Sequence, residues 1–115
     1  MKKNKKKRLV HEHKVVHARQ RAQERYGLTL TKDLRFQFLS AIRHCKSTAS
    51  FLRKLKGMRQ LWVVSHVGMI LPIVYDSFWN DVVTILPQNE LNKFKQQIAM
   101  FQKLINESQT LPLCG

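Results

Sequence analysis

Four short apolar segments between residues 47 and 86 constrain the fold of this chain more than any other feature. They are rich in β-branched and aromatic residues, and turn-forming residues such as Lys56-Gly57-Met58 separate them. The connections have at most six residues. Such short connections suit antiparallel neighbours, because parallel strands need a long crossover. The sequence therefore predicts an antiparallel meander over residues 47–55, 61–64, 69–75 and 82–86.

Pro72 and the turns qualify this prediction. Pro72 lies inside the third segment and has no backbone N–H, so it predicts a sheet edge, a bulge or a strand start. The hairpin turn before that segment is expected over residues 65–68. The turn expected over residues 76–81 carries two adjacent aromatic residues, Phe78 and Trp79.

A basic helix is expected over residues 9–26, where apolar residues recur at spacings of three and four. Gly27 would end it, because a residue without a Cβ readily adopts the left-handed conformation of a helix C-terminus. Arg25 suits the negative end of the helix dipole. The apolar face consists of Val15, Ala18, Ala22 and Tyr26, and the opposite side of Lys14, His17, Arg21 and Glu24.

Two further helices are expected on either side of the strands. Thr31 is a good N-cap for a helix over residues 32–44. After Pro87, a strong apolar stripe predicts a helix over residues 89–107, which would pack on the sheet or dock a partner. Its apolar residues are Leu91, Phe94, Ile98, Phe101, Leu104 and Ile105.

These elements predict one α+β domain. Two N-terminal helices would pack on an antiparallel sheet of about four strands, and a C-terminal amphipathic helix would follow. The expected domain covers residues 9–107, with a basic flexible tail over residues 1–8 and a C-terminal tail over residues 108–115.

The formal net charge of +14 is large for 115 residues, and it lies wholly in the first half. Residues 1–25 carry ten Lys or Arg against two acids, and residues 26–60 carry eight against one. Residues 61–115 carry three against four. This asymmetry favours a polyanionic partner, most often nucleic acid.

Other partners and cofactors find little support in the sequence. No segment approaches the ~20 apolar residues of a membrane span, and the basic helix lacks a broad apolar face, so no membrane contact is expected. Cys45 and Cys114 form neither a disulfide framework nor a zinc spacing, which favours a reducing cytoplasm. His13 and His17 make an incomplete metal site, so no metal or other cofactor is expected.

The histidine-bearing face of the first helix has two interpretations. It could be an ordinary solvated face, on which Glu24 offsets the arginines. Alternatively it could face phosphate, with His17 exchanging a proton near neutral pH and arginines binding the anion through paired hydrogen bonds.

Two motifs in this chain resemble those of a known group. The first is His17-Ala18-Arg19-x-Arg21-x-x-Glu24-Arg25-Tyr26-Gly27, followed by Leu30-Thr31, and the second is Val74-Tyr75-Asp76 with Val82-Val83-Thr84-Ile85-Leu86-Pro87. The chain resembles small phage and bacterial domains with a HAxxRxxERyG helix and a vvyD…ivTvLP strand pair. These domains are similar to the barnase–EndoU–colicin–RelE-like superfamily, which contains many ribonuclease toxins.

The resemblance covers about residues 15–87 and implies two helices on a twisted sheet, with a nucleic-acid surface on the exposed side. His17, Arg21 and Thr84 match polar positions of the motif. Arg19, Glu24 and Arg25 match its charged positions. The long helix after Pro87 departs from the shortest members, and it would cover the sheet face or form a dimer.

Metal-independent RNA cleavage needs a base, an acid and cations that stabilise the phosphorane. His17 and His66 are candidates for the acid and base, although a histidine at the position of His66 is more often a turn residue. Tyr75 could stack on a base or simply pack in the sheet. The candidate catalytic residues are His17, Arg21, His66 and Thr84, and the candidate nucleic-acid contacts are Lys14, Arg19, Arg25, Lys54, Arg59 and Tyr75.

Three functions follow as hypotheses. The first is a metal-independent ribonuclease toxin or an inactive relative, acting on RNA rather than DNA and controlled by an antitoxin or another protein. The second is a non-enzymatic nucleic-acid-binding module. The third is a phage or secretion accessory protein that docks a partner through exposed apolar residues of the C-terminal helix.

Overall fold

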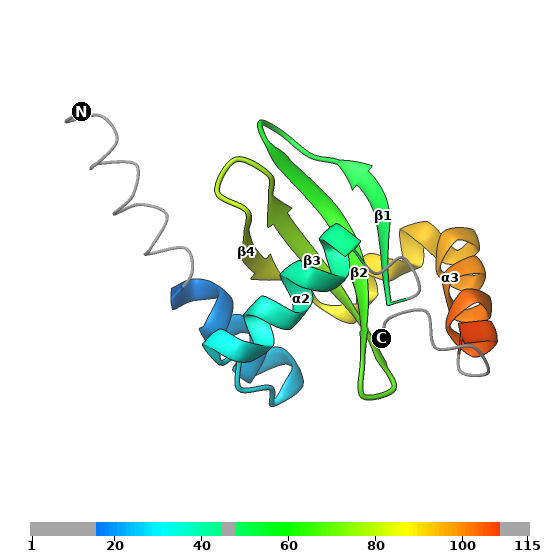
Figure 1. Cartoon of the computed structure of the whole chain (residues 1–115), viewed down its shortest axis with the longest axis horizontal. Coiled ribbons are helices and arrows are strands. Elements are labelled where there is room, and N and C mark those ends of the chain that lie inside the picture. Colours follow the sequence, from blue (N-terminus) through cyan, green and yellow to red (C-terminus); the bar gives the residue numbers. More distant parts are fainter. Residues whose placement is uncertain (1–15, 45–47, 109–115) are drawn as a thin grey trace.

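A four-stranded antiparallel sheet forms the centre of the chain in the computed structural model, which describes residues 16–44 and 48–108 (Figure 1). Helix α1 is described over residues 16–26, so residues 9–15 of the predicted helix lie outside the described residues. The two predicted tails also lie outside them, except for Ser108, the first residue of the C-terminal tail. The remaining elements are α2 (Lys32–His44), β1 (Ala49–Lys54), β2 (Arg59–His66), β3 (Met69–Asp76), β4 (Asp81–Ile85), a 3₁₀ helix η1 (Gln88–Phe94) and α3 (Lys95–Ser108).

The predicted α+β fold class and the meander are confirmed. The strands follow one another across the sheet in the order β1-β2-β3-β4, and every neighbouring pair is antiparallel. The one difference in element type is the C-terminal helix, which begins as η1 and becomes α-helical only at Lys95.

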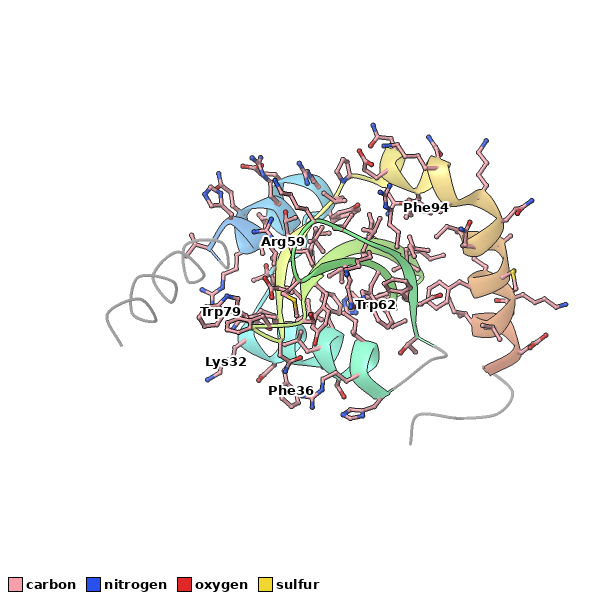
Figure 2. All side chains as sticks on the ribbon, turned by 90° about the horizontal axis from the view of Figure 1, so that it is seen from above. Lys32, Phe36, Arg59, Trp62, Trp79 and Phe94 are labelled. Atoms are coloured by element: carbon pink, nitrogen blue, oxygen red, sulfur yellow. The ribbon has the colours of Figure 1, made fainter. Side chains whose placement is uncertain are left out.

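Helices cover both faces of the sheet. On one face α1 and α2 bury Ala18, Ala22, Phe38 and Ile42 in a cluster that includes Ile73 of the sheet. On the other face η1 and α3 pack Leu91 and Phe101 against Val63. Viewed from above, α2 lies on one side of the sheet, and η1 and α3 lie on the other (Figure 2). The sheet face that the resemblance would leave open to nucleic acid is therefore covered by this chain's own C-terminal helix.

The ends of the N-terminal helices form as predicted. Gly27 is left-handed, with a φ of 59°, and its N–H donates to the Gln23 carbonyl at 3.0 Å, which closes α1. The Thr31 hydroxyl accepts the Leu34 N–H at 3.1 Å and caps α2. Both signals are local, so they can be recognised without knowledge of the tertiary structure.

Pro72 shows where a local prediction was wrong. It lies inside β3, an internal strand, opposite Val63 of β2, and the bulge in the β3–β4 pairing falls between Val74 and Tyr75. The Pro72 carbonyl accepts the Leu86 N–H at 2.8 Å, just beyond the last residue of β4. An antiparallel pair would return a bond to the Leu86 carbonyl, and Pro72 has no N–H to give.

Helix α1 supplies the donor that Pro72 lacks. The Tyr26 hydroxyl donates to the Leu86 carbonyl at 2.5 Å, and Arg25 Nη1 donates to the Ile85 carbonyl at 2.6 Å. Both carbonyls belong to the end of the β4 edge, where backbone groups otherwise remain unpaired. The last turn of α1 thus ties the helix to the sheet. Burial raises the pKa of the Tyr26 hydroxyl above its ordinary value of 10.0, although the Gln88 hydrogen bond and Arg25 lower it in part.

We expect Tyr26→Phe to lower the free energy of unfolding by about 1 kcal/mol at pH 7, because it removes the only donor to the Leu86 carbonyl among the described contacts. The folded-state pKa of Tyr26 is raised, so its contribution is complete below the ordinary pKa of 10.0 and is lost as the pH rises from there through the raised folded-state pKa. Urea unfolding of both proteins at pH 7 and pH 11 measures this. A stability difference that grows at pH 11 contradicts the assignment.

The β2–β3 hairpin turn contains a strained residue. Val67 and Gly68 form the turn, with φ values of 48° and 75°, whereas Ser65 and His66 belong to β2 rather than to the turn. Two successive positive φ angles favour Asn-Gly, because a β-branched side chain is disfavoured in the left-handed region. The Val67 side chain is 83% exposed, so core packing does not repay the strain.

We expect Val67→Asn to raise the free energy of unfolding by about 1 kcal/mol, because asparagine tolerates the left-handed conformation better than valine. Chemical denaturation measures the change. Gly68→Ala is the matched variant: a Cβ there meets nothing within 4 Å, so any loss of stability comes from the backbone conformation alone. Equal stability of the Val67→Asn variant and the unmodified protein contradicts the strain.

Candidate nucleic-acid interface

The predicted site residues on α1 fall into two groups. His17, Arg19 and Arg21 are exposed on the helix, and Arg21 pairs with Glu24 at 3.0 Å. Arg25 is engaged by the Ile85 carbonyl, so its guanidinium has a structural role at the sheet edge. Lys14 and His13 lie outside the described residues.

The structure does not bring the four candidate catalytic residues together. His66 ends β2 and lies edge-on against the ring of Phe38 of α2, with 5.5 Å between the ring centroids. Thr84 pairs with Val74, which belongs to the cluster on the opposite face of the sheet. His66 and Thr84 therefore point to different faces. His17 and Arg21, four residues apart on α1, are the only pair of this set that shares an element.

Tyr75 is a core residue. Its side chain is 8% exposed, and its hydroxyl donates to Asn80 Oδ1 at 2.7 Å. Burial raises the pKa of this hydroxyl, the charge of Arg43 lowers it, and Asp76 raises it. With its ring inside the core beside α2, Tyr75 cannot offer a face for a base to stack on.

Exposed aromatic and basic side chains gather at one end of the sheet, where the β1–β2 and β3–β4 turns meet. A shallow pocket of about 340 Å³ lies between these turns. We call its residues the aromatic end: Lys56, Gly57, Met58, Arg59, Asp76, Phe78 and Trp79. Arg59 and Trp79 can be followed in Figure 2. Phe78 is 64% exposed and Met58 is 57% exposed, so two large apolar side chains lie open to solvent beside two cations.

Hydrogen bonds hold the two turns in place. One carboxylate oxygen of Asp76 accepts the N–H groups of Phe78 at 2.9 Å and of Trp79 at 3.1 Å. The N–H and hydroxyl of Ser77 both donate to the Met58 carbonyl, at 2.9 Å and 3.0 Å. The turn that carries the aromatic residues is thus fixed to the turn that carries the basic ones.

The residues that follow Trp79 in the β3–β4 turn are also held in place. Asn80 adopts a φ of 53° and accepts the Tyr75 hydroxyl. Arg35 of α2 pairs with Asp81 at 3.2 Å, and these side chains are only 19% and 15% exposed. The Phe78 and Trp79 rings lie edge to face, with centroids 5.2 Å apart. A large ring held exposed on a rigid turn is typical of a binding surface.

Two predicted contacts belong to this region. Arg59 lines the pocket, and Lys54 ends β1 with an exposed side chain. The prediction missed Phe78, Trp79, Lys56 and Met58 as site residues, although two adjacent aromatic residues in an expected turn were a usable signal. What the sequence could not show is that the two turns, about twenty residues apart, lie side by side.

Within residues 16–44 and 48–108, no three His, Cys, Asp or Glu side chains come close enough to hold a metal ion. No helix of that part of the chain has the length and apolar character needed to cross a membrane.

Comparison with known proteins returns no relative. No protein-family model, no curated protein and no solved structure matches this chain. The similarity to the ribonuclease toxin superfamily therefore stays a prediction.

Proposed function

We propose that this chain binds single-stranded nucleic acid at the aromatic end. The observation that carries the proposal is Phe78, an exposed ring on a turn fixed by hydrogen bonds, beside Lys56 and Arg59. Unpaired bases stack on such rings, and nearby cations contact the phosphates on either side. A shallow pocket of about 340 Å³ suits one base, whereas a base inside a duplex offers no free face.

The charge distribution supports the same site. Arg53, Lys54, Lys56 and Arg59 follow one another along β1, the β1–β2 turn and the start of β2, and no acidic residue interrupts them. The preference for RNA over DNA, and an antitoxin or another protein as a regulator, come from the resemblance alone. A cytoplasmic setting belongs to the same proposal and rests on the two cysteines, which lie outside the described residues.

We expect Phe78→Ala to weaken binding of a labelled single-stranded RNA by about tenfold, because one stacking contact is lost. Fluorescence anisotropy measures the affinity. Met100→Ala is the matched control, since Met100 is an apolar residue of α3 that is 69% exposed and lies outside the pocket. If the two variants bind the RNA with equal affinity, the aromatic end is not the binding site.

Lys56→Gln should also reduce the salt dependence of binding by about one phosphate contact, whereas Lys103→Gln should not.

Cleavage of the bound RNA is a second candidate function, and one observation favours it. His17 and Arg21 lie one helical turn apart on α1, with exposed side chains that a phosphate could reach. An imidazole can transfer a proton near neutral pH, and a guanidinium can stabilise the phosphorane charge. The spacing of these two residues is set by the helix, so the arrangement does not depend on a loop.

If this second function holds, the protein cleaves labelled RNA in EDTA and His17→Ala lowers the rate at least about a hundredfold, as expected for loss of an acid or base. His44→Ala is the control, because His44 is an exposed histidine at the end of α2. Full activity in the His17→Ala variant excludes a catalytic role for His17. Retention of RNA without cleavage by the unmodified protein leaves the binding module as the function.

The third hypothesis keeps only part of its support. Leu91 is 9% exposed and Phe101 is 1% exposed, because the apolar stripe of η1 and α3 packs on the sheet. Phe94, Ile98 and Ile105 are half-buried and Leu104 is 49% exposed, so the stripe is only partly covered within this chain.

A further inference from the structure

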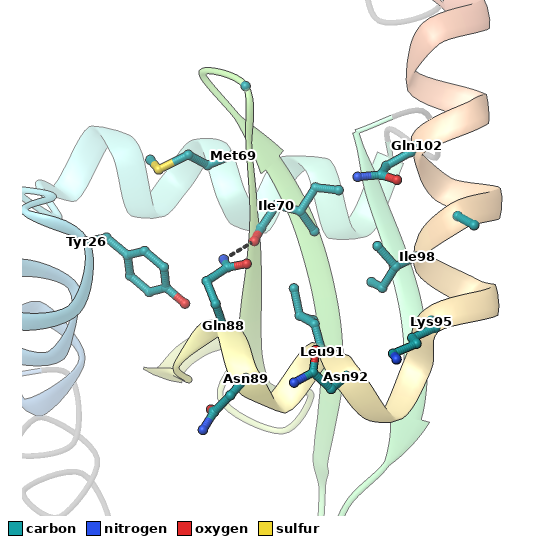
Figure 3. A pocket seen from close by; sticks show the side chains of 12 residues that line it. Tyr26, Met69, Ile70, Gln88, Asn89, Leu91, Asn92, Lys95, Ile98 and Gln102 are labelled. Atoms are coloured by element: carbon teal, nitrogen blue, oxygen red, sulfur yellow. Dashed lines mark hydrogen bonds between the residues drawn. The ribbon is translucent and has the colours of Figure 1, made fainter.

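A larger cleft lies away from the aromatic end, between the last turn of α1, the start of β3 and the row formed by η1 and α3 (Figure 3). Its volume is about 830 Å³, within the range of about 300–1,000 Å³ that is usual for small-molecule sites. Ile70, Leu91 and Ile98 point toward its middle and form an apolar surface. We call this site the amide cleft, because Gln88, Asn89, Asn92 and Gln102 also line it.

The 3₁₀ geometry of η1 arranges these polar side chains. A 3₁₀ helix has three residues per turn, so residues three apart lie above one another. Asn89 and Asn92 of η1 have this spacing, and Lys95, the first residue of α3, follows them along the cleft. Gln102 continues the row on α3, two turns beyond Lys95. Seven residues is long for a 3₁₀ segment, and this one places the amides of Asn89 and Asn92 one above the other.

One end of the amide cleft is held rigid. Gln88 Nε2 donates to the Ile70 carbonyl at 2.5 Å, and Gln88 also shares a hydrogen bond with the Tyr26 hydroxyl. Tyr26 itself is anchored on the Leu86 carbonyl. This end wall therefore belongs to the same network that joins α1 to the sheet.

The charges of the residues that line the amide cleft indicate which class of ligand it can bind. None of the residues that line the amide cleft is acidic, and Lys95 is the one cation among them. A metal ion would need carboxylates, and a polyphosphate would need more than one cation. A purely apolar ligand would contact Ile70, Leu91 and Ile98 but would use none of the four amides that line the cleft. A flat body with several donors and acceptors and a single phosphate fits all three constraints.

We propose that the amide cleft binds one nucleoside monophosphate, either free or as a nucleotide of a single strand. The side-chain amide of Asn92 and that of Gln102 each offer a donor and an acceptor side by side, the pattern that pairs with the edge of a base. Ile70, Leu91 and Ile98 contact the face of the base, and Lys95 contacts the phosphate. None of these residues belongs to the aromatic end, so this site does not depend on the function proposed above.

The test is a titration of the full chain with each of the four ribonucleoside 5′-monophosphates, followed by NMR of the side-chain amide groups. We expect the signals of Asn89, Asn92 and Gln102 to shift. Asn92→Leu and Gln102→Leu should each weaken binding by about tenfold. Gln97→Leu is the control, because Gln97 is an exposed glutamine of α3 that does not line the cleft. Lys95→Gln should weaken binding of the nucleotide and leave that of the corresponding nucleoside unchanged.

A hexanucleotide of the same base, titrated in parallel, distinguishes the two sources of the ligand. Shifts with mononucleotide and hexanucleotide assign the cleft to a nucleotide as such, and shifts with the hexanucleotide alone assign it to a strand. If neither moves the cleft amides, or if the leucine variants bind as well as Gln97→Leu, the proposal is wrong. Phe78→Ala separates the two sites, since it should leave mononucleotide binding unchanged and affect only contacts at the aromatic end.

Discussion

A sheet that is apolar on both faces is the constraint on which the rest of this structure depends. Ile73 and Leu71 point to one side of β3, and Val74 points to the other, and all three are buried. Exposing either face would leave a large apolar surface in water, so both need a cover. The two N-terminal helices cover one face, and the helical row from Gln88 to Ser108 covers the other.

This constraint moves the candidate binding surfaces away from the faces of the sheet. A flat sheet face is unavailable, and what remains are the ends of the strands and the seams where helices meet the sheet. The aromatic end lies at the ends of strands and is built from two turns joined by hydrogen bonds. The amide cleft lies at a seam between helices and sheet, where α1 and η1 approach the start of β3. The same two-sided packing explains why Leu91 and Phe101 are buried and why the polar side of α3 is open.

The agreement between sequence and structure follows the range of the interactions. Helix α2 has the predicted bounds because Thr31 and the apolar spacing act within one or two turns. The positions of the strands agree to within a few residues, since each turn carries its own signal. The prediction for Pro72 was wrong because an internal strand can hold a proline at the point where the neighbouring strand ends. There the Tyr26 hydroxyl donates to the Leu86 carbonyl in place of the missing N–H. The predicted catalytic site agrees least with the structure, because His66 and Thr84 lie on opposite faces of the sheet.

The sequence by itself determined the elements, their order and the concentration of positive charge in the first half, because periodicity, capping and composition are properties of neighbouring residues. Only the tertiary structure decided which residues can act together. It placed Phe78 beside Arg59 and Lys56, engaged Arg25 and Tyr26 in holding α1 to the sheet, and buried Tyr75. The physical reason is that burial, strand neighbours and the meeting of distant turns depend on how the apolar faces are covered, and that is settled by the chain as a whole.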